Sequence, residues 1–184
     1  MTTALIIIDI QNDYFDGGSN PLFGSNKAAT NARLIMDDFR SKGFPIIHIQ
    51  HLATRPTATF FLPGTAGAEI FADVRPLDNE KLIVKHYPNS FRETDLLKYL
   101  QSMEVGQLVI CGMMTHMCVD ATTRAAKDFG FGCTVIGDAC ATKNLEIDGQ
   151  LIKSTDVQAS FLAALSYFYS TIKTAKEYLC NDCK

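Results

Sequence analysis

The sequence lacks the basic clusters and long apolar runs that mark proteins bound to nucleic acid or embedded in membranes. Its 184 residues carry a formal net charge of -3, so no electrostatic footprint for nucleic acid or anionic lipid is present. The apolar run at residues 4–8 ends at Asp9 and follows no basic segment, which is unlike a signal peptide or a membrane span. We also find no internal repeat or low-complexity segment. These absences predict a cytoplasmic protein with no nucleic-acid or membrane partner.

A disulfide framework is also absent from the pattern of cysteines. A chain of this length with 47% hydrophobic residues can bury a sufficient core without disulfides, which favours a reducing compartment. Cys180 and Cys183 have the C-x-x-C spacing, but they do not open a helix after a strand. A thiol-redox protein that uses this pair is kept as one alternative. The six cysteines are Cys111, Cys118, Cys133, Cys140, Cys180 and Cys183.

Apolar runs without polar alternation alternate with amphipathic stretches along the chain. Such runs are typical of strands buried on both faces of a parallel sheet. We therefore predict one three-layer, doubly wound (Rossmann-like) α/β domain spanning residues 1–184, with a mainly parallel sheet and helices on both faces. Strands are expected at residues 4–8, 45–51, 81–84, 108–111 and 131–136, with a short edge strand at 170–174.

Helices are expected between these strands. Apolar spacing and the stop at Gly43 predict a helix over residues 25–42. Capping-box spacing at Ser90 predicts the start of another, and a further helix follows the turn after Gly112. The last, beginning near residue 154, is expected to bury Val157, Phe161, Leu162, Leu165 and Phe168. Residues 52–80 are expected to be a long loop with a short helix at most.

Three reactive side chains come directly after predicted strands. Asp9 follows the first strand, Lys85 the third, and Cys118 the turn after the fourth. Because parallel strands share one carboxyl edge, we expect the three groups to meet there. Each alone could have a bland role, as a turn residue or a buried core cysteine.

Cys118 is expected in the first turn of a helix. Free amides and the positive end of the helix dipole there would lower the pKa of its thiol and bind an oxyanion. A carboxylate such as Asp9 can accept the thiol proton and return it to a leaving group, while the Lys85 ammonium stabilises both anions. This chemistry is acyl transfer to water through a thioester.

These residues resemble the isochorismatase-like cysteine hydrolases, a family that includes nicotinamidases and N-carbamoylsarcosine amidohydrolases. The resemblance covers nearly the whole chain, and the segment before Cys118 is its most specific part. It is carried by Asp9-Ile-Gln11, the segment 63–69, Lys85, Ser90-Phe91, the segment 112–119 and Gly137-Asp138-Ala139.

The resemblance implies an Asp-Lys-Cys triad formed by Asp9, Lys85 and Cys118. It also implies a cis peptide bond between Met113 and Met114, and an oxyanion hole formed by the backbone N–H groups of Met114 and Cys118. Members of the family usually form homo-oligomers, so a dimer or larger assembly is expected, in which a neighbouring subunit can contribute to the pocket.

Two departures from the family pattern narrow the expected activity. Nicotinamidases bind a metal with an Asp-x-His pair after the second strand and a further His before the Gly-Thr-x-Gly segment. Here His51-Leu52-Ala53 and Phe60-Phe61 occupy these positions, so we expect no metal and no cofactor. Isochorismatases have glycine in place of the triad cysteine, whereas Cys118 is present and favours an amide or carbamoyl substrate.

Residues near the predicted edge are candidates for contacts with a small-molecule substrate. Phe15, Phe60 and Phe61, with Met114, could line an apolar pocket, although each suits an ordinary core equally. His51, at the end of the second strand, is a further candidate. His116 is expected to line the pocket or the surface, since two-residue spacing separates it from the helix face of Cys118.

The sequence thus predicts a metal-free cysteine hydrolase of a small amide or related C–N bond. An isochorismatase-type vinyl-ether hydrolase and a catalytically idle binding protein on the same fold are the alternatives.

Overall fold

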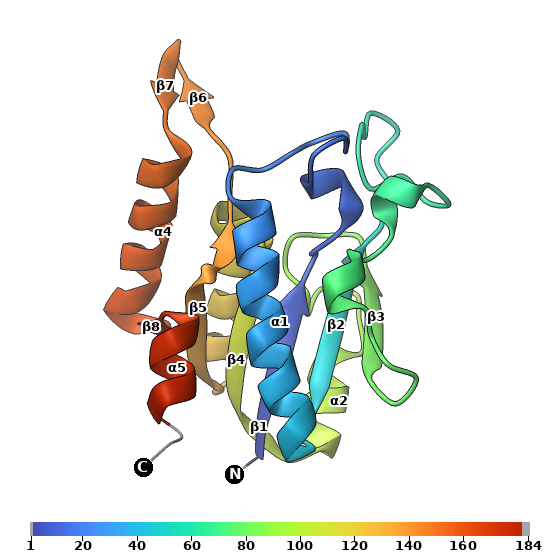
Figure 1. Cartoon of the computed structure of the whole chain (residues 1–184), viewed down its shortest axis with the longest axis vertical. Helices are drawn as coiled ribbons and strands as arrows, with labels where there is room; N and C mark the ends of the chain where they lie inside the picture. Colours follow the sequence, from blue (N-terminus) through green and yellow to red (C-terminus); the bar gives the residue numbers. More distant parts are fainter. Residues whose placement is uncertain (1, 182–184) are drawn as a thin grey trace.

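The structure is a computed structural model that describes residues 2–181. Six parallel strands form the sheet at the centre of the molecule (Figure 1). The strand order is β3-β2-β1-β4-β5-β8, so the chain reverses its direction of winding between β1 and β4. Open α/β sheets bind ligands at the carboxyl edge next to such a reversal. The strands are β1 (Thr2–Ile8), β2 (Ile46–His51), β3 (Lys81–Lys85), β4 (Val105–Met113), β5 (Gly132–Ala141) and β8 (Thr171–Lys173).

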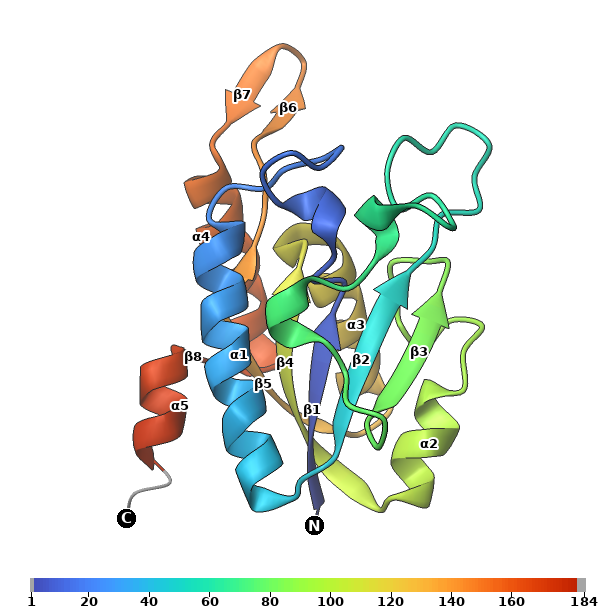
Figure 2. The same ribbon diagram turned by 45° about the vertical axis from the view of Figure 1, so that its right-hand side comes forward.

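Helices cover both faces of this sheet, which confirms the predicted three-layer α/β architecture. Side chains of β1 alternate between the two cores: Leu5 and Ile7 pack toward α1 and α5, and Ile6 packs with the opposite helices. Figure 2 shows α1 in front of the sheet and α3 behind it. The helices are α1 (Ser25–Lys42) and α5 (Ala175–Asn181) on one face, and α2 (Leu96–Ser102), α3 (Asp120–Asp128) and α4 (Ser154–Phe168) on the other.

Several elements differ from the prediction. The prediction that a helix starts at Ser90 is wrong, because α2 begins at Leu96. Ser90 is buried, and its backbone N–H and its hydroxyl both form hydrogen bonds with the Thr122 hydroxyl. In α4, Val157 and Leu165 are buried, but Phe168 is 64% exposed. An antiparallel hairpin of β6 (Leu145–Ile147) and β7 (Gln150–Ile152) projects beyond the sheet (Figure 1), and neither it nor α5 was predicted.

The two central strands approach each other closely at Gly112. This residue has φ 137°, and a Cβ there would overlap the carbonyl oxygen of Ile8 in β1. The pairing of β4 with β5 also shifts register between Ile110 and Gly112. A glycine therefore lets the end of β4 turn against β1, where the predicted site lies. Within residues 2–181, no helix is both long and apolar enough to cross a membrane.

Candidate active site

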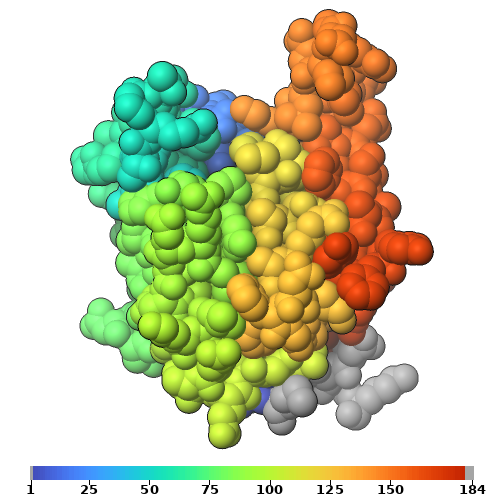
Figure 3. All heavy atoms as spheres, turned by 180° about the vertical axis from the view of Figure 1, so that it is seen from behind, coloured from blue at the N-terminus to red at the C-terminus, as the bar shows by residue number. Residues whose placement is uncertain are grey.

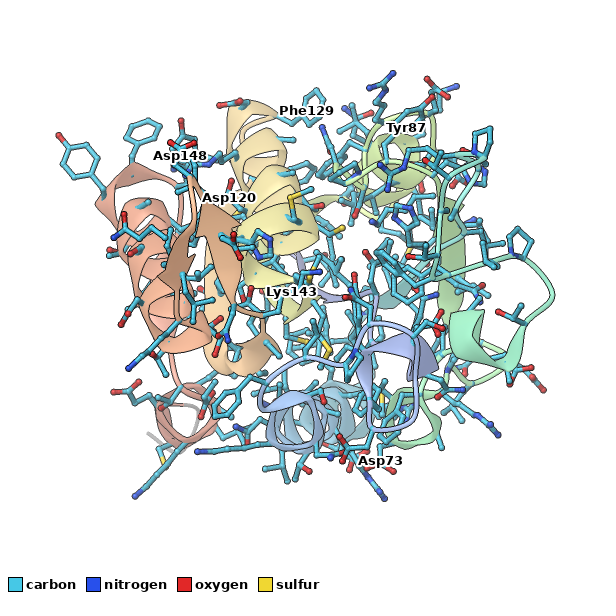
Figure 4. The ribbon with its side chains drawn as sticks, turned by 90° about the horizontal axis from the view of Figure 1, so that it is seen from above. Asp73, Tyr87, Asp120, Phe129, Lys143 and Asp148 are labelled. Carbon is cyan, nitrogen blue, oxygen red and sulfur yellow. The ribbon has the colours of Figure 1, made fainter. Side chains whose placement is uncertain are left out.

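Four side chains at the ends of strands β1 to β4 meet at the carboxyl edge of the sheet. Figure 4 views this edge from above. Asp9 follows β1, His51 ends β2, Lys85 ends β3, and Cys118 lies in a π-helical turn, Thr115–Val119, between β4 and α3. The Lys85 ammonium donates to Asp9 Oδ2 at 2.6 Å, and both side chains are fully buried. A carboxylate oxygen of Asp9, a ring nitrogen of His51 and Sγ of Cys118 lie within 4.8 Å of one another.

Lys85 is held by three acceptors. Besides Asp9, its Nζ lies 3.1 Å from His51 Nδ1 and donates to the carbonyl oxygen of Tyr87 at 3.1 Å. Burial alone would lower the pKa of Lys85, but Asp9 and Cys118 raise it above its ordinary value. Burial, and then the charge of Lys85, lower the pKa of His51 to about 3. His51 is therefore neutral at pH 7, and its Nδ1 can accept a hydrogen bond from the ammonium.

Cys118 is a buried thiol rather than an exposed thiolate. It is 5% exposed, and burial together with the charge of Asp9 raises its pKa, against the opposing effect of Lys85. The prediction that its place in the first turn lowers this pKa is therefore wrong. Burial in a low-dielectric site disfavours the charged thiolate. Cys118 needs a base to become a nucleophile, and Asp9 is the carboxylate beside it.

Asp9 has two features that set it apart from a turn carboxylate. Its φ of 51° is left-handed, a conformation that non-glycine residues rarely adopt. Its Oδ1 is buried and has no hydrogen-bond partner within residues 2–181, although Oδ2 binds Lys85. Burial raises the pKa of Asp9 above its ordinary value, although Lys85 lowers it. A buried, unpartnered carboxylate oxygen is a candidate general base.

The turn before Cys118 contains the one non-proline cis peptide bond within residues 2–181, between Met113 and Met114. This is the bond that the family resemblance implies. Beyond it, the Met114 carbonyl accepts the backbone N–H groups of Met117 and Val119, at 3.0 and 3.3 Å. These bonds fix the turn that presents Cys118. The assignment of the Met114 and Cys118 amides to an oxyanion hole stays a prediction.

Three aromatic side chains, Tyr14, Phe60 and Phe61, lie together beside the four groups, and we call them the aromatic wall. The Phe61 ring centroid is 4.6 Å from Tyr14, 4.9 Å from Phe60 and 5.8 Å from His51. The sequence placed His51, Phe60 and Phe61 near the site but selected Phe15 rather than Tyr14. Phe15 instead stacks on Phe71 at 3.6 Å.

Tyr14 was missed because the 3₁₀ turn Asn12–Tyr14, which reorients the chain after Asp9, has no clear sequence signal. The pKa of its hydroxyl is raised well above the ordinary value, first by burial and then by the charges of Cys118 and Asp9. The one signal in the sequence was the adjacent aromatic pair Tyr14-Phe15, from which either residue could have been selected as a neighbour of the site.

Two other histidines lie outside this group. His116 Nδ1 lies 2.6 Å from the Thr142 hydroxyl, and its ring packs on Phe161. His48 is buried in β2, with Nε2 2.8 Å from Glu80. Neither is positioned to act on Cys118.

Asp9, His51 and Cys118 are also the one group of potential metal ligands within residues 2–181. Lys85 Nζ already makes close contacts with Asp9 and His51, so a divalent cation would have to displace an ammonium group. The residues present fit an internal ion pair better than a metal site.

A cavity of about 470 Å³ opens elsewhere, between α1, β5 and α4. None of the four central residues lines it, although Cys140 and Gln158 do. We therefore attach the candidate chemistry to the edge of the sheet and not to this cavity.

Comparison with known proteins adds independent information. A family model described as "Isochorismatase domain" matches residues 3–166. The isochorismatase family protein YddQ of Bacillus subtilis (strain 168) is 49% identical over 179 residues, covering 97% of this chain and 99% of the relative. Nicotinamidase 3 of Arabidopsis thaliana is 26% identical over 156 residues, covering 78% of this chain and 75% of the relative.

A solved structure agrees with the fold. The structure of an isochorismatase-hydrolase candidate from Oleispira antarctica has a TM-score of 0.94 and 46% identity, covering 97% of this chain and 96% of that one. The family match spans most of the chain, including Asp9, Lys85 and Cys118. The chain belongs to the isochorismatase family of hydrolases.

Proposed function

We propose that this hydrolase cleaves a small amide or other C–N bond through a thioester on Cys118. The observation that carries the proposal is Asp9 Oδ1, a buried carboxylate oxygen without a hydrogen-bond partner within residues 2–181. It belongs to a side chain that lies within 4.8 Å of both His51 and Cys118. An acceptor in that position is suited to receive the thiol proton.

In the first step, Asp9 removes the proton from Cys118 as Sγ attacks the substrate carbonyl carbon. The C=O electron pair moves onto oxygen and gives a tetrahedral oxyanion. Lys85 keeps its positive charge throughout, because its pKa is raised. It stabilises the negative charge that moves from Asp9 toward Cys118 as the proton is transferred.

The oxyanion is assigned to the backbone N–H groups of Met114 and Cys118. Loss of one such donor in a hydrolase costs roughly 3 kcal/mol of transition-state stabilisation, so this contribution is comparable with the acid–base step. Asp9 then returns the proton to the leaving nitrogen as the C–N bond breaks, and a thioester remains.

Water completes the cycle. Asp9, again a carboxylate, removes a proton from a water molecule that attacks the thioester carbonyl, and Cys118 leaves as a thiol when the proton is returned. Lys85 stays protonated, and no oxidant, metal or cofactor enters this balance.

The aromatic wall suggests the kind of group attached to the carbonyl. Tyr14 and Phe61 are 1% exposed and Phe60 is partly buried, and their rings form an apolar cluster that contacts His51 through Phe61. A small planar or apolar acyl group fits such a wall better than a charged one. Nicotinamide enters the test set because a relative is named a nicotinamidase, although the histidines that hold the nicotinamidase metal are replaced here.

The test is a screen for ammonia release from small amides, ureides and nicotinamide, followed by acid quench and mass spectrometry. We expect an acyl adduct on Cys118 with any substrate that releases ammonia. Ammonia release without an adduct on Cys118, even in burst-phase samples, would argue for a mechanism without a thioester.

Two alternatives have their own readouts. A catalytically idle protein would leave Cys118 no more reactive toward iodoacetamide than the buried Cys111 or Cys133. A redox protein would lose its activity when Cys180 and Cys183 are both replaced by serine. Cys180 is an exposed thiol in α5, while Cys183 lies outside the described residues.

A further inference from the structure

Asp13, in the 3₁₀ turn after Asp9, ties two separate segments to the site with one carboxylate. It is 4% exposed. Its Oδ2 accepts the backbone N–H of Phe61 at 2.6 Å, and its Oδ1 accepts that of Ser19 at 3.1 Å. The proposed reaction uses none of these contacts. Within residues 2–181, this buried carboxylate accepts only backbone amides, and such bonds fix the backbone.

The Asp13–Phe61 bond is placed where it controls the aromatic wall. Phe61 is 1% exposed and has φ 57°, and its carbonyl accepts the N–H of Ala53 at 2.9 Å. Its ring lies against Tyr14 and His51, and His51 in turn contacts Lys85. The carboxylate therefore fixes a residue that lies two contacts away from the catalytic ammonium.

The outer side of this wall, at Phe60, faces a cavity. A cavity of about 390 Å³ borders Phe60 and is lined by Asp13 and Gly67 among others. Gly67 fits closely against the carboxylate, since a Cβ there would overlap Asp13 Oδ1. Without the bond from Asp13, the Phe60–Phe61 segment would have open space into which it could move.

We propose that Asp13 is a positioning residue that holds the aromatic wall beside Cys118 and so sets the affinity for an apolar, planar substrate group. The proposal rests on the function above, because it takes Cys118 as the reacting atom. It predicts an effect on recognition of that group and little effect on the intrinsic reactivity of the thiol.

The experiment uses two alkylating probes that differ by one ring, iodoacetamide and its N-phenyl derivative. Alkylation of Cys118 is followed by peptide mass mapping in the full chain carrying Cys180→Ser and Cys183→Ser, which removes the exposed thiol of Cys180. The readout is the ratio of the two rate constants. General loosening of the fold would raise both rates, whereas loss of the wall lowers the preference for the N-phenyl probe.

The variant is Asp13→Asn, which replaces one acceptor oxygen by an N–H₂ group, and the matched control is Asp16→Asn. Asp16 is exposed in the same loop, so the control makes the same charge change. We expect the ratio to fall about fivefold in Asp13→Asn, the size of one aromatic stacking contact, and to be unchanged in Asp16→Asn.

A second variant tests the proposal if Asp13→Asn does not fold. In Gly67→Ala, the added Cβ would overlap the Asp13 carboxylate and should lower the ratio in the same direction. A folded Asp13→Asn protein with the wild-type ratio would overturn the proposal, as would a wild-type ratio in Gly67→Ala if Asp13→Asn does not fold. If Cys118 of the parent protein reacts no faster than Cys111, the proposed function fails instead.

Discussion

At the residue scale, the site depends on one ammonium shared among three acceptors. Lys85 contacts Asp9, His51 and the Tyr87 carbonyl, and it is buried with Asp9. Removing one partner of a buried ion pair leaves an uncompensated buried charge. This destabilises the protein more than replacing both partners with apolar residues. Asp9 is therefore kept ionised by Lys85 while its other oxygen stays available as a base.

The pH dependence of hydrolysis should report Asp9 on its acid side. Because burial raises the pKa of Asp9 above 3.8, kcat/KM should rise with pH through a limb above that value. The raised pKa of Lys85 places any loss from its deprotonation above pH 10.5. A rate profile measured from pH 3 to 11.5 checks both limbs, and an acid limb below pH 3.8 would contradict the assignment.

Replacing the ammonium tests its role. In Lys85→Met, Asp9 loses the charge that lowers its pKa, so the acid limb should move to higher pH. The rate at its optimum should fall roughly 10²–10⁴-fold, the usual contribution of general acid–base catalysis, because Asp9 loses the charge that keeps it ionised. Lys81→Met, which removes a partly exposed lysine at the other end of β3, is the control. An unshifted limb in Lys85→Met would show that Lys85 does not act on Asp9.

The roles of residues at strand ends could be predicted from sequence, because apolar runs mark the buried strands and the reactive residue follows each run directly or after a short turn. Asp9, Lys85 and Cys118 were found in this way and lie together. Tyr14 and Asp13 were not found, because their roles depend on which way a 3₁₀ turn faces. The direction of the Cys118 pKa was missed for a related reason: burial cannot be read from a local motif.

At the scale of elements, the approach of β4 to β1 depends on Gly112. We expect Gly112→Ala to destabilise the protein by about 2–4 kcal/mol, because the added Cβ overlaps the Ile8 carbonyl and φ stays positive. Gly149→Ala is the matched control, since Gly149 has φ 74° with open space around it and should cost about 1 kcal/mol. Urea unfolding measures both, and equal losses would mean that the close contact is unimportant.

A partly buried ion cluster attaches the segment before β3 to β2 and α1. Glu80 accepts bonds from Arg40 at 2.7 Å and from the Leu77 backbone at 2.9 Å, and it lies 2.8 Å from His48. Burial alone would raise the pKa of Glu80, but these bonds, first that of Arg40, lower it to about 2. Burial lowers the pKa of His48 against the opposing bond to Glu80.

These shifts predict a loss of stability in acid. The contribution of Glu80 is present above pH 4.5 and is lost as the pH falls toward 2, because the unfolded chain binds a proton first. His48 adds to the loss below pH 6.5, since its protonation is easier after unfolding.

The matching variant is Glu80→Gln, which should lower stability at pH 7 by about 1–3 kcal/mol through weakened hydrogen bonds. It should also flatten the fall in melting temperature between pH 4.5 and 2. Glu146→Gln, at an exposed position, should do neither. A Glu80→Gln protein with a wild-type pH profile would exclude this cluster as a source of acid sensitivity.

Periodic elements and the short edge strand β8 were predictable, whereas element ends, the β6–β7 hairpin and α5 were not. Buried strands and α1 have strong apolar patterns, but β5 continues past Gly137 and Asp138 because Cys140 pairs with Gly112 after a register shift. The capping-box pattern at Ser90 misled the prediction of α2, since the Ser90 hydroxyl is engaged by Thr122 of α3. Such contacts are tertiary and leave no mark on neighbouring residues.

At the scale of the whole molecule, loops distant in sequence surround the carboxyl edge. Gln11 binds the backbone of His51 and Ala68, and Asn12 binds that of Ala66 and Glu69, so the segment after β1 orders the long loop 52–80. Figure 3 shows part of this loop and the β6–β7 hairpin rising on either side of the segment around residue 118. The layers could be predicted from sequence, but this loop packing could not.

The hairpin also bears on assembly, which stays a prediction. Ile147 and Leu151 are 62% and 59% exposed on a two-stranded unit that has little stability by itself. We expect a second copy of the chain to cover them. Light scattering after gel filtration should give a dimer or larger species, with a smaller mass in Ile147→Ser, Leu151→Ser. A wild-type monomer at high concentration would contradict this expectation.

The central claim is tested most directly by the hydrolysis rate of Cys118→Ala on a substrate that releases ammonia with the wild-type protein. The account predicts a loss of roughly 10⁴-fold or more, as found when a hydrolase loses its nucleophile, while Cys111→Ala stays active. A Cys118→Ala protein that hydrolyses the substrate at the wild-type rate would contradict it.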